Sequence, residues 1–280
     1  MISAKLRHLL TTCGALVALI RWVGLGIFAL SAVGCGSWSS RADILETGTV
    51  TQVLEVCKTS LDNGNYVRSV ECFKRMTGRF PFGPESEQAQ LNLAFAQSKV
   101  GDSEEALASI NRFIKTYPTH PNVDYAFYLR GLTNYERSQG LLSKLVPEDR
   151  ATHDPTMSKQ AFLDFSEMVK RFPDSEYAPD ARARMLALRS LLADSELHVA
   201  NYYLRRGVYI GALNRAKFIV ESYQSTPQSH TALAIMVQCY EALGEKVLAD
   251  EAREVLKLNA PQHAFLTGET SKKRWWKFGG

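Results

Sequence analysis

The chain has 280 residues, of which 45% are hydrophobic and 22% are charged. Its 33 basic and 29 acidic residues give a formal net charge of +4, and three of the basic residues lie among the first 34. Without those three, 30 basic residues face 29 acidic ones, and a net charge of +1 excludes strong electrostatic steering toward nucleic acid. We therefore expect no nucleic acid among the partners.

Residues 1–34 have the pattern of a secretory signal peptide. Lys5, Arg7 and Arg21 make the start positive, and an apolar run over 22–34 ends in small residues directly before Cys35. The run is shorter than the about 20 apolar residues that a membrane-spanning helix needs. The pattern predicts export and removal of this segment.

Cys35 is a candidate lipid attachment site. The run Leu30-Ser31-Ala32-Val33-Gly34-Cys35 resembles a bacterial lipobox, in which the cysteine sulfur takes a diacylglycerol, although leucine is usual where Ala32 stands. Acyl chains on this cysteine would hold a soluble domain on a bilayer. Gly36 stands where an aspartate would signal retention in the inner membrane, and by resemblance to lipoprotein sorting this favours the periplasmic face of the outer membrane. The alternative is an ordinary exported protein in which Cys35 has no role.

Residues 35–50 are rich in Ser and Gly and are expected to form a tether. From 51 to 262 one spacing recurs: a glycine, a small residue five positions later, and a proline twelve positions after that. Three copies are complete and two are degenerate: Gly64, Ser69 and Pro81; Gly101, Ala106 and Pro118; Ala161 and Pro173; Gly207 and Ala212; Gly244, Ala249 and Pro261. Uninterrupted copies recur every 37 residues, near the about 34-residue period of tetratricopeptide hairpins.

Helix packing explains this spacing. Glycine adopts the left-handed backbone that ends the first helix, the small residue lets the second helix approach closely, and the proline ends that helix. Since one hairpin cannot bury its apolar face alone, stacked neighbours must share a core. The sequence therefore predicts an all-α fold, an α-solenoid of five tetratricopeptide-like helical hairpins with a concave surface.

Cys57 and Cys72 lie seven residues before and eight residues after Gly64, so they could face each other across the first hairpin. An oxidising compartment would permit a disulfide between them. The preferred interpretation is that both are small apolar core residues, because cysteine is among the most often buried residue types.

Two further segments depart from the repeat. Pro118 and Pro173 are 55 residues apart instead of 37, which places an insertion of 18 residues near 137–155. A loop of this length is either a surface excursion or a partner contact. The C-terminal tail, 263–280, ends in interleaved basic and aromatic residues. It could contact a membrane surface, dock on another molecule or bind nothing.

Several runs are more specific than the generic repeat. They are Arg79-Phe80-Pro81-Phe82-Gly83-Pro84-Glu85-Ser86, Thr116-Tyr117-Pro118-Thr119-His120-Pro121-Asn122, Tyr128-Leu129-Arg130-Gly131-Leu132-Thr133-Asn134, Phe172-Pro173-Asp174-Ser175-Glu176-Tyr177 and Val199-Ala200-Asn201-Tyr202-Tyr203. These runs resemble the BamD family, the lipoproteins of the outer-membrane β-barrel assembly machinery. The resemblance extends over about 64–258. It implies a periplasmic adaptor that binds BamA through its C-terminal repeats, with smaller lipoproteins alongside. It further implies that the N-terminal repeats meet the C-terminal signal of unfolded outer-membrane β-barrel substrates.

The first helix of each tetratricopeptide hairpin lines the concave face, which predicts a peptide groove there. Aromatic side chains suit an extended apolar peptide, since each ring buries a large area. The candidates are Leu91, Phe95, Tyr125, Tyr128, Leu132 and Tyr135. Alternatively, these side chains fill contacts between repeats.

Three arginines around the turn at Gly207, namely Arg205, Arg206 and Arg215, are candidates for the BamA interface. Arginine is enriched at interface hot spots because its planar fork pairs carboxylates and carbonyls. The alternative is that two of them form a solvated helix end.

The chain has none of the common phosphate-loop, zinc-protease, paired-cysteine or serine-hydrolase motifs, and its histidines lack ligand spacing. His120 lies in a Pro-Thr-His-Pro turn, where rigidity explains it. We therefore expect no enzyme activity, catalytic residue, metal or cofactor. The two hypotheses are a BamD-like adaptor and a tetratricopeptide lipoprotein that regulates a cell-wall synthase or other envelope enzyme; a hydrolase with an accessory repeat array is third.

Overall fold

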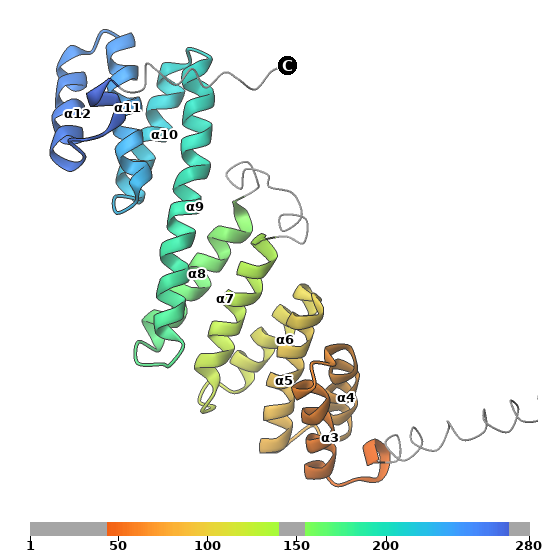
Figure 1. Ribbon diagram of the computed structural model, residues 1–280. Coiled ribbons are helices and arrows are strands. Elements are labelled where there is room, and N and C mark those ends of the chain that lie inside the picture. The colour runs from red at the N-terminus through yellow and green to blue at the C-terminus, as the bar shows by residue number, and fades with distance from the viewer. Residues whose placement is uncertain (1–43, 140–154, 269–280) are drawn as a thin grey trace, which may run out of the picture. The chain divides into compact units, whose positions relative to one another are not determined.

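The computed structural model describes residues 44–139 and 155–268, and within them every regular element is a helix (Figure 1). In chain order these are α3 (Val50–Asp62), α4 (Tyr66–Arg79), α5 (Pro84–Val100), α6 (Ser103–Thr116), α7 (Val123–Gln139), α8 (Thr156–Arg171), α9 (Ala178–Arg205), α10 (Tyr209–Ser222), α11 (Pro227–Ala242), α12 (Lys246–Asn259) and α13 (Ala264–Thr267). The helices from α3 to α12 form five successive pairs, which confirms the all-α repeat fold. The chain divides after Gln90 into two compact units.

Several predictions concern residues outside the described ranges. They are the signal peptide at 1–34, the lipidated Cys35, most of the 35–50 tether, the central part of the 137–155 insertion and the basic aromatic part of the 263–280 tail. The structure places the ends of the insertion, since α7 ends at Gln139 and α8 begins at Thr156.

The turn glycines behave as predicted. Gly64, Gly101, Gly207 and Gly244 have φ values of 71°, 96°, 72° and 81°, in the left-handed region that favours glycine. Each lies between the two helices of one pair. The small residues five positions later, Ser69, Ala106, Ala212 and Ala249, are at most 2% exposed. Close approach of paired helices at these points is therefore confirmed.

The prolines mark the ends of the second helices. α4, α6, α8 and α12 each end two residues before a proline, at Arg79, Thr116, Arg171 and Asn259. The residue between is Phe80, Tyr117, Phe172 or Ala260, and its N–H donates to the carbonyl four residues back. Since a residue before proline disfavours the helical backbone, the helix ends there.

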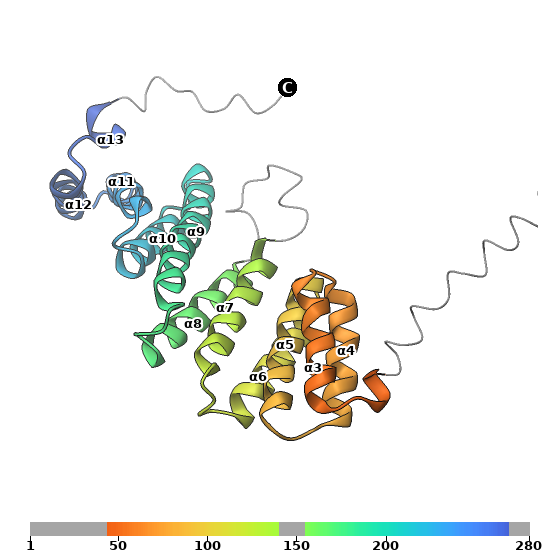
Figure 2. The same ribbon diagram turned by 60° about the horizontal axis from the view of Figure 1, so that its bottom comes forward.

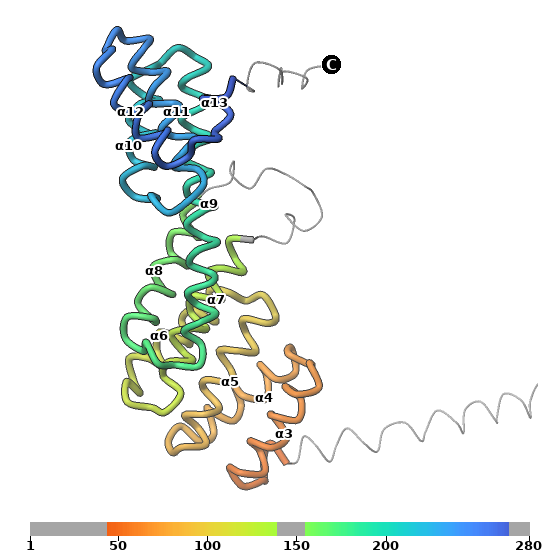
Figure 3. Tube along the Cα trace, turned by 60° about the vertical axis from the view of Figure 1, so that its left-hand side comes forward, coloured from red at the N-terminus to blue at the C-terminus, as the bar shows by residue number. Residues whose placement is uncertain are grey.

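Helix α9 differs from the repeat pattern, because it runs for 28 residues without interruption. Pro179 lies in its first turn, and no glycine or proline follows before Gly207. Its first half packs with α8 and its second half with α10 and α11 (Figures 1 and 3). α9 therefore packs against the third helical pair with its first half and against α10 and α11 with its second half.

The core of the second unit consists of linked apolar clusters. One lies between α5, α6 and α7, a second between α7, α8 and α9, and a third between α9, α10, α11 and α12. The short α13 follows α12 (Figure 2), and its Phe265 and Leu266 pack near Leu233 and Leu256. Within the described residues, no helix is both long enough and apolar enough to span a bilayer.

In the first unit, a disulfide joins Cys57 of α3 to Cys72 of α4, with an Sγ–Sγ distance of 2.08 Å. The preferred interpretation, two core cysteines without a bond between them, is therefore wrong. Their predicted burial is confirmed, since Cys57 is 0% and Cys72 3% exposed. Burial and bonding are compatible here because the two residues meet at the contact between paired helices.

Candidate functional site

Three tyrosines from two helices of the second unit lie in ring contact. Tyr125 and Tyr128 are in the first two turns of α7, and Tyr177 immediately precedes α9. The rings of Tyr128 and Tyr177 stack with centroids 5.1 Å apart, and those of Tyr125 and Tyr177 are 5.2 Å apart. All three are partly exposed. We call Tyr125, Tyr128 and Tyr177 the tyrosine cluster.

A chain of polar contacts borders the tyrosine cluster. The Tyr128 hydroxyl donates to Asp180 Oδ2 at 2.6 Å, and the same oxygen accepts from Arg184 Nε at 2.5 Å. The Arg184 guanidinium also lies 5.0 Å from the centre of the Tyr135 ring. Polar and aromatic contacts thus hold α7 against α9 beside a partly exposed aromatic surface.

The electrostatics keep these groups in defined protonation states. Burial raises the pKa of Tyr125 well above its usual range, and burial together with Glu176 raises the pKa of Tyr177 to about 12. Burial and the hydrogen bond to Asp180 also raise the pKa of Tyr128. Burial opposes ionisation of Asp180, but hydrogen bonds from Tyr128 and Arg184 lower its pKa overall. At neutral pH the hydroxyls are donors beside an ionised carboxylate.

The other predicted groove residues are placed differently. Leu91 is 2% exposed and packs with Ile110 and Leu129, so it is a core residue and offers no accessible surface. Phe95 is partly buried against the same core, with Lys99 Nζ 5.5 Å from its ring centre. Leu132 packs against the next cluster, near Phe165. Of the predicted set, Tyr125 and Tyr128 are in ring contact, and Tyr135 is linked to Tyr128 only through Arg184 and Asp180 of α9.

Sequence reasoning missed the partners supplied by α9, namely Tyr177, Asp180 and Arg184. Two local signals could have identified them. Pro179 in the first turn marks a helix start, which places Tyr177 at its entry. Asp180 and Arg184 are four residues apart, the spacing of an ion pair on one helix face. Neither signal specifies that α7 packs beside this turn.

The three candidate arginines have different surroundings. Arg205 and Arg206 lie at the C-terminal end of α9, with the Arg206 guanidinium 5.5 Å from the Tyr202 ring centre. Arg215 of α10 instead pairs with Glu196 at 3.0 Å, and Glu196 is only 9% exposed. Arg215 is therefore committed to a contact within the unit.

Exposed apolar side chains accompany the first two arginines. Tyr202, Val208 and Ile210 are 45%, 48% and 63% exposed and surround the same turn at Gly207. We call Arg205, Arg206, Tyr202, Val208 and Ile210 the Gly207 surface. Mixed basic, aromatic and aliphatic side chains of this kind are typical of protein interfaces.

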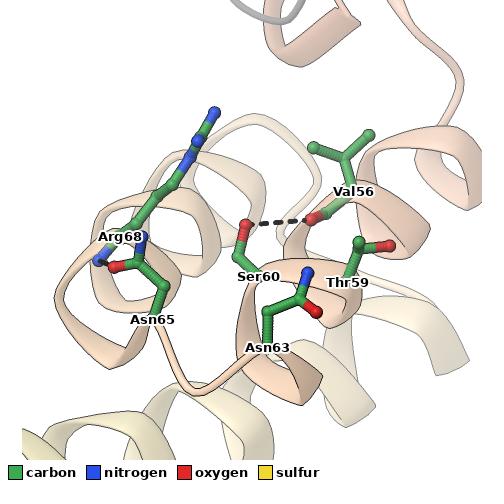
Figure 4. Close-up of a pocket in the computed structure, with 6 residues that line it drawn as sticks. All are labelled: Val56, Thr59, Ser60, Asn63, Asn65 and Arg68. Atoms are coloured by element: carbon green, nitrogen blue, oxygen red, sulfur yellow. Dashed lines mark hydrogen bonds between the residues drawn. The ribbon is translucent and has the colours of Figure 1, made fainter.

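The first unit contains a small pocket of about 220 Å³ at the turn between α3 and α4. Figure 4 shows the residues that line it: Val56, Thr59, Ser60, Asn63, Asn65 and Arg68. The Ser60 hydroxyl donates to the Val56 carbonyl at 3.3 Å, and Asn65 Oδ1 accepts from the Arg68 backbone N–H at 3.3 Å. The pocket therefore presents amide, hydroxyl and guanidinium groups from both helix ends.

A second pocket, of about 490 Å³, lies between the loops that follow α6 and α8. His120 lines it, and its Nδ1 accepts from the Asn122 N–H at 3.0 Å while its ring meets Phe113 edge-on at 5.1 Å. These contacts agree with a role of His120 in stiffening the turn. Among the described residues, no three His, Cys, Asp or Glu side chains are grouped so as to hold a metal.

Comparison with known proteins assigns the family. A family described as YfiO, outer membrane lipoprotein, matches residues 46–256. The outer membrane protein assembly factor BamD of Neisseria meningitidis serogroup A is 38% identical over 258 residues, covering 91% of this chain and 97% of the relative. BamD of Xylella fastidiosa strain Temecula1 is 41% identical over 229 residues, covering 82% of this chain and 77% of the relative.

Among solved structures, PilW, a widely conserved type IV pilus biogenesis factor, matches over 93% of this chain and 98% of its own, with a TM-score of 0.33 and 14% identity. The sequence relatives, in contrast, exceed 35% identity over most of both chains. The chain therefore belongs to the BamD family of outer membrane protein assembly factors.

Proposed function

We propose that this chain is a lipid-anchored adaptor on the periplasmic face of the outer membrane, which binds BamA and receives the targeting signals of unfolded β-barrel proteins. Its role in outer membrane protein assembly follows from its family. The adaptor works by holding partners and performs no catalysis. The observation that carries the binding role is the partly exposed tyrosine cluster with its polar border.

The tyrosine cluster suits an extended peptide with apolar and aromatic side chains. Its rings offer apolar area and have few rotatable bonds, so binding orders them at little entropy cost. Contacts between α7 and α9 already fix their positions. Each aromatic ring of a bound peptide would stack on this surface. Such a ring pair stabilises binding by about 0.5–1.5 kcal/mol in addition to the free energy of burying apolar area. Arg184 and Asp180 would meet the peptide's polar groups at the border.

The pocket in the first unit is a second candidate contact for a targeting signal. Family resemblance assigns signal recognition to the N-terminal repeats, and this pocket lies in the first of them. Arg68 and the amides of Asn63 and Asn65 are the groups that bind carboxylates and peptide backbone. We assign the end of the signal to this pocket.

We assign BamA to the Gly207 surface. Arginine and tyrosine are enriched among interface hot spots, and Val208 and Ile210 expose apolar area next to them. Arg205 and Arg206 are exposed at this surface, and the contact is therefore assigned to them. Other lipoproteins of the machinery would bind alongside.

A crossed experiment tests both assignments in one protein. Peptides with the C-terminal residues of an outer-membrane β-barrel protein are titrated against the wild type and the Tyr128→Ala and Ile210→Asp variants, and BamA binding is measured in parallel. Loss of the Tyr128 ring should raise the dissociation constant of the peptide at least about tenfold, the scale of losing one aromatic hot-spot contact. It should leave BamA binding unchanged. Ile210→Asp should do the reverse.

The Tyr128→Phe variant is the matched control, because it removes the hydroxyl that reaches Asp180 and keeps the ring. It should retain most peptide binding. If Tyr128→Ala binds the peptide as the wild type does, the groove assignment is wrong. Recovery of a cell-wall synthase in place of BamA would instead support the rival function as a regulator of an envelope enzyme.

A further inference from the structure

The disulfide of the first unit encloses the residues that line its pocket. Cys57 and Cys72 are separated by 15 positions, and Thr59, Ser60, Asn63, Asn65 and Arg68 all lie between them. The sixth lining residue, Val56, is next to Cys57. The bond therefore fixes the relative position of the two helix ends that form the pocket.

Few side chains of α3 are fully buried. They are Val53 and Cys57, so the cysteine is one of two. α4 buries Ser69, Cys72, Phe73 and Met76. Isolated helices of 13 or 14 residues, the lengths of α3 and α4, are marginal in water. Apart from the disulfide, α3 packs through Val53 and through apolar side chains that are only half buried, namely Leu54, Val56 and Leu61.

Several polar contacts of this hairpin are local. Thr49 and Gln52 cap the start of α3, Asn65 caps the start of α4, and the Ser69 hydroxyl donates to the Asn65 carbonyl at 2.8 Å. Two hydrogen bonds connect the hairpin's ends: the Asn65 N–H donates to the Ser60 carbonyl, and Arg79 Nη1 donates to the Leu45 carbonyl, both at 3.0 Å. The disulfide is the covalent link between the middle parts of α3 and α4.

We propose that the α3–α4 hairpin and its pocket are completed by an oxidative step, and that this chain is therefore a substrate of a thiol–disulfide oxidant. The thiolate of one cysteine attacks the oxidant's disulfide and releases one oxidant thiol, leaving a mixed disulfide. The second cysteine thiolate attacks the sulfur of the first and releases the second oxidant thiol. Two thiols of the chain lose two electrons and two protons, and the oxidant's disulfide is reduced to a dithiol.

Burial sets the order of events and selects the pair. Since both sulfur atoms are enclosed in the closed hairpin, exchange takes place before α3 packs against α4. The remaining described cysteine, Cys239, is buried in α11 and is free. In the folded second unit, burial raises the pKa of Cys239 to about 11, which favours its thiol form. The inference goes beyond the proposed function, since it holds whatever the pocket binds.

Hydrogen exchange of the mature chain, oxidised and after reduction with dithiothreitol, tests the proposal. Reduction should speed amide exchange of α3 and the α3–α4 turn by about a hundredfold, the scale set by releasing a 15-residue closed loop. Peptides from α7, α10 and α12 should not change. Unfolding without reductant should expose one labelled thiol in the repeat domain, at Cys239, and unfolding after reduction should expose three.

Two variants separate the bond from the packing. Cys57→Ala/Cys72→Ala keeps small apolar side chains and removes the bond, and it should exchange as the reduced wild type does. Cys239→Ser is the matched control and should keep α3 protected. Protection of α3 that survives both reduction and the double alanine variant would overturn the proposal, as would three reactive thiols without reductant. If α3 opens on reduction while peptide binding persists, the assignment of the signal to the pocket fails and the oxidative step stands.

Discussion

Gly131 of α7 lies directly against the ring of Phe165 of α8. A Cβ built on this residue would be 2.7 Å from Cδ1 of Phe165, which is fully buried. Glycine is therefore required here by space, and not by backbone conformation. The Tyr128-Leu129-Arg130-Gly131 run that carries the family resemblance thus has a packing reason.

Gly131→Ala should destabilise the second unit by about 1–3 kcal/mol, because the Phe165 ring has no room to move aside. Urea denaturation followed by circular dichroism measures the change. Gly78→Ala is the matched control, since its added Cβ on α4 would meet nothing within 4 Å. It should be neutral or stabilising by up to about 1 kcal/mol. A neutral Gly131→Ala would contradict the packing described for α7 and α8.

Asp164 is a second residue whose role is set by burial. It is 4% exposed, and it accepts from Asn134 Nδ2 at 2.7 Å and Gln160 Nε2 at 3.1 Å. Arg130 Nε lies 3.0 Å from the same carboxylate. Asp164→Ala should cost about 1–3 kcal/mol of unfolding free energy, because it leaves the buried Asn134 amide without its acceptor. Arg130 would keep its other ion pair, with Glu167.

The same denaturation experiment checks this expectation against an exposed ion pair. Asp250 contacts Arg253 at 2.8 Å, but its side chain is 73% exposed. Asp250→Ala should therefore change stability by at most about 1 kcal/mol. Equal losses of unfolding free energy in Asp164→Ala and Asp250→Ala would show that the buried network stabilises the fold no more than an exposed ion pair does.

At the scale of elements, α13 depends on a histidine. Nδ1 of His263 accepts from the Phe265 N–H at 3.2 Å, and its Nε2 is 3.5 Å from the Thr231 hydroxyl of α11. Burial and the nearby His230, also on α11, lower the pKa of His263. Protonation removes the acceptor at Nδ1 and places charge in a partly buried site.

The stability that His263 contributes should fall as the pH is lowered. The folded chain binds this proton less readily than the unfolded chain, so the contribution of His263 to stability is present above the unfolded pKa of about 6.5 and is lost as pH falls below it. Amide exchange in 260–268 should therefore speed up between about pH 7 and pH 5 relative to the intrinsic rate. His263→Asn keeps a side-chain acceptor and does not titrate, so its protection should not change with pH. Persistence of the effect in that variant would assign it to another group.

The elements show what the sequence could predict. Glycine, small residue and proline act through local backbone and contact geometry, so the turns at Gly64, Gly101, Gly207 and Gly244 were found correctly. The length of α9 was not predicted, because the repeat spacing marks only its end, at Gly207. The spacing of Cys57 and Cys72 allowed them to face each other, but oxidation state is not encoded in spacing.

The candidate site was less predictable than the fold. Periodicity placed Leu91 on the same helix face as Phe95, yet packing between α5, α6 and α7 buries the leucine. The tyrosine cluster needs Tyr177, which is 49 positions after Tyr128 in the chain. Such contacts depend on which helices become neighbours, and local patterns do not contain that information.

At the scale of the second unit, α9 connects the two proposed binding surfaces. Tyr177 precedes its first residue, and Arg206 follows its last. A helix of 28 residues is about 42 Å long at 1.5 Å per residue. The tyrosine cluster and the Gly207 surface thus lie at opposite ends of one continuous helix.

At the scale of the whole molecule, Cys35 is proposed to provide the attachment to the membrane. Cys35→Ala should move the exported chain from the membrane pellet to the soluble periplasmic fraction, because the acyl chains supply about 0.8 kcal/mol for each buried methylene. Immunoblotting of fractions measures the shift. Cys239→Ser, which alters a buried thiol far along the chain, should remain in the pellet. A Cys35→Ala variant that stays membrane-bound would refute the lipid as the sole anchor.

The central claim is that this chain is an adaptor that holds BamA. Its most direct measurement is quantitative mass spectrometry of proteins that copurify with the tagged chain from detergent-solubilised outer membranes, for the wild type and Ile210→Asp. We predict near-stoichiometric BamA with the wild type and at least about a tenfold loss with Ile210→Asp, the effect of a buried charge at an interface centre. Absence of BamA from the wild-type sample, under conditions that retain the machinery's other lipoproteins, would contradict the account.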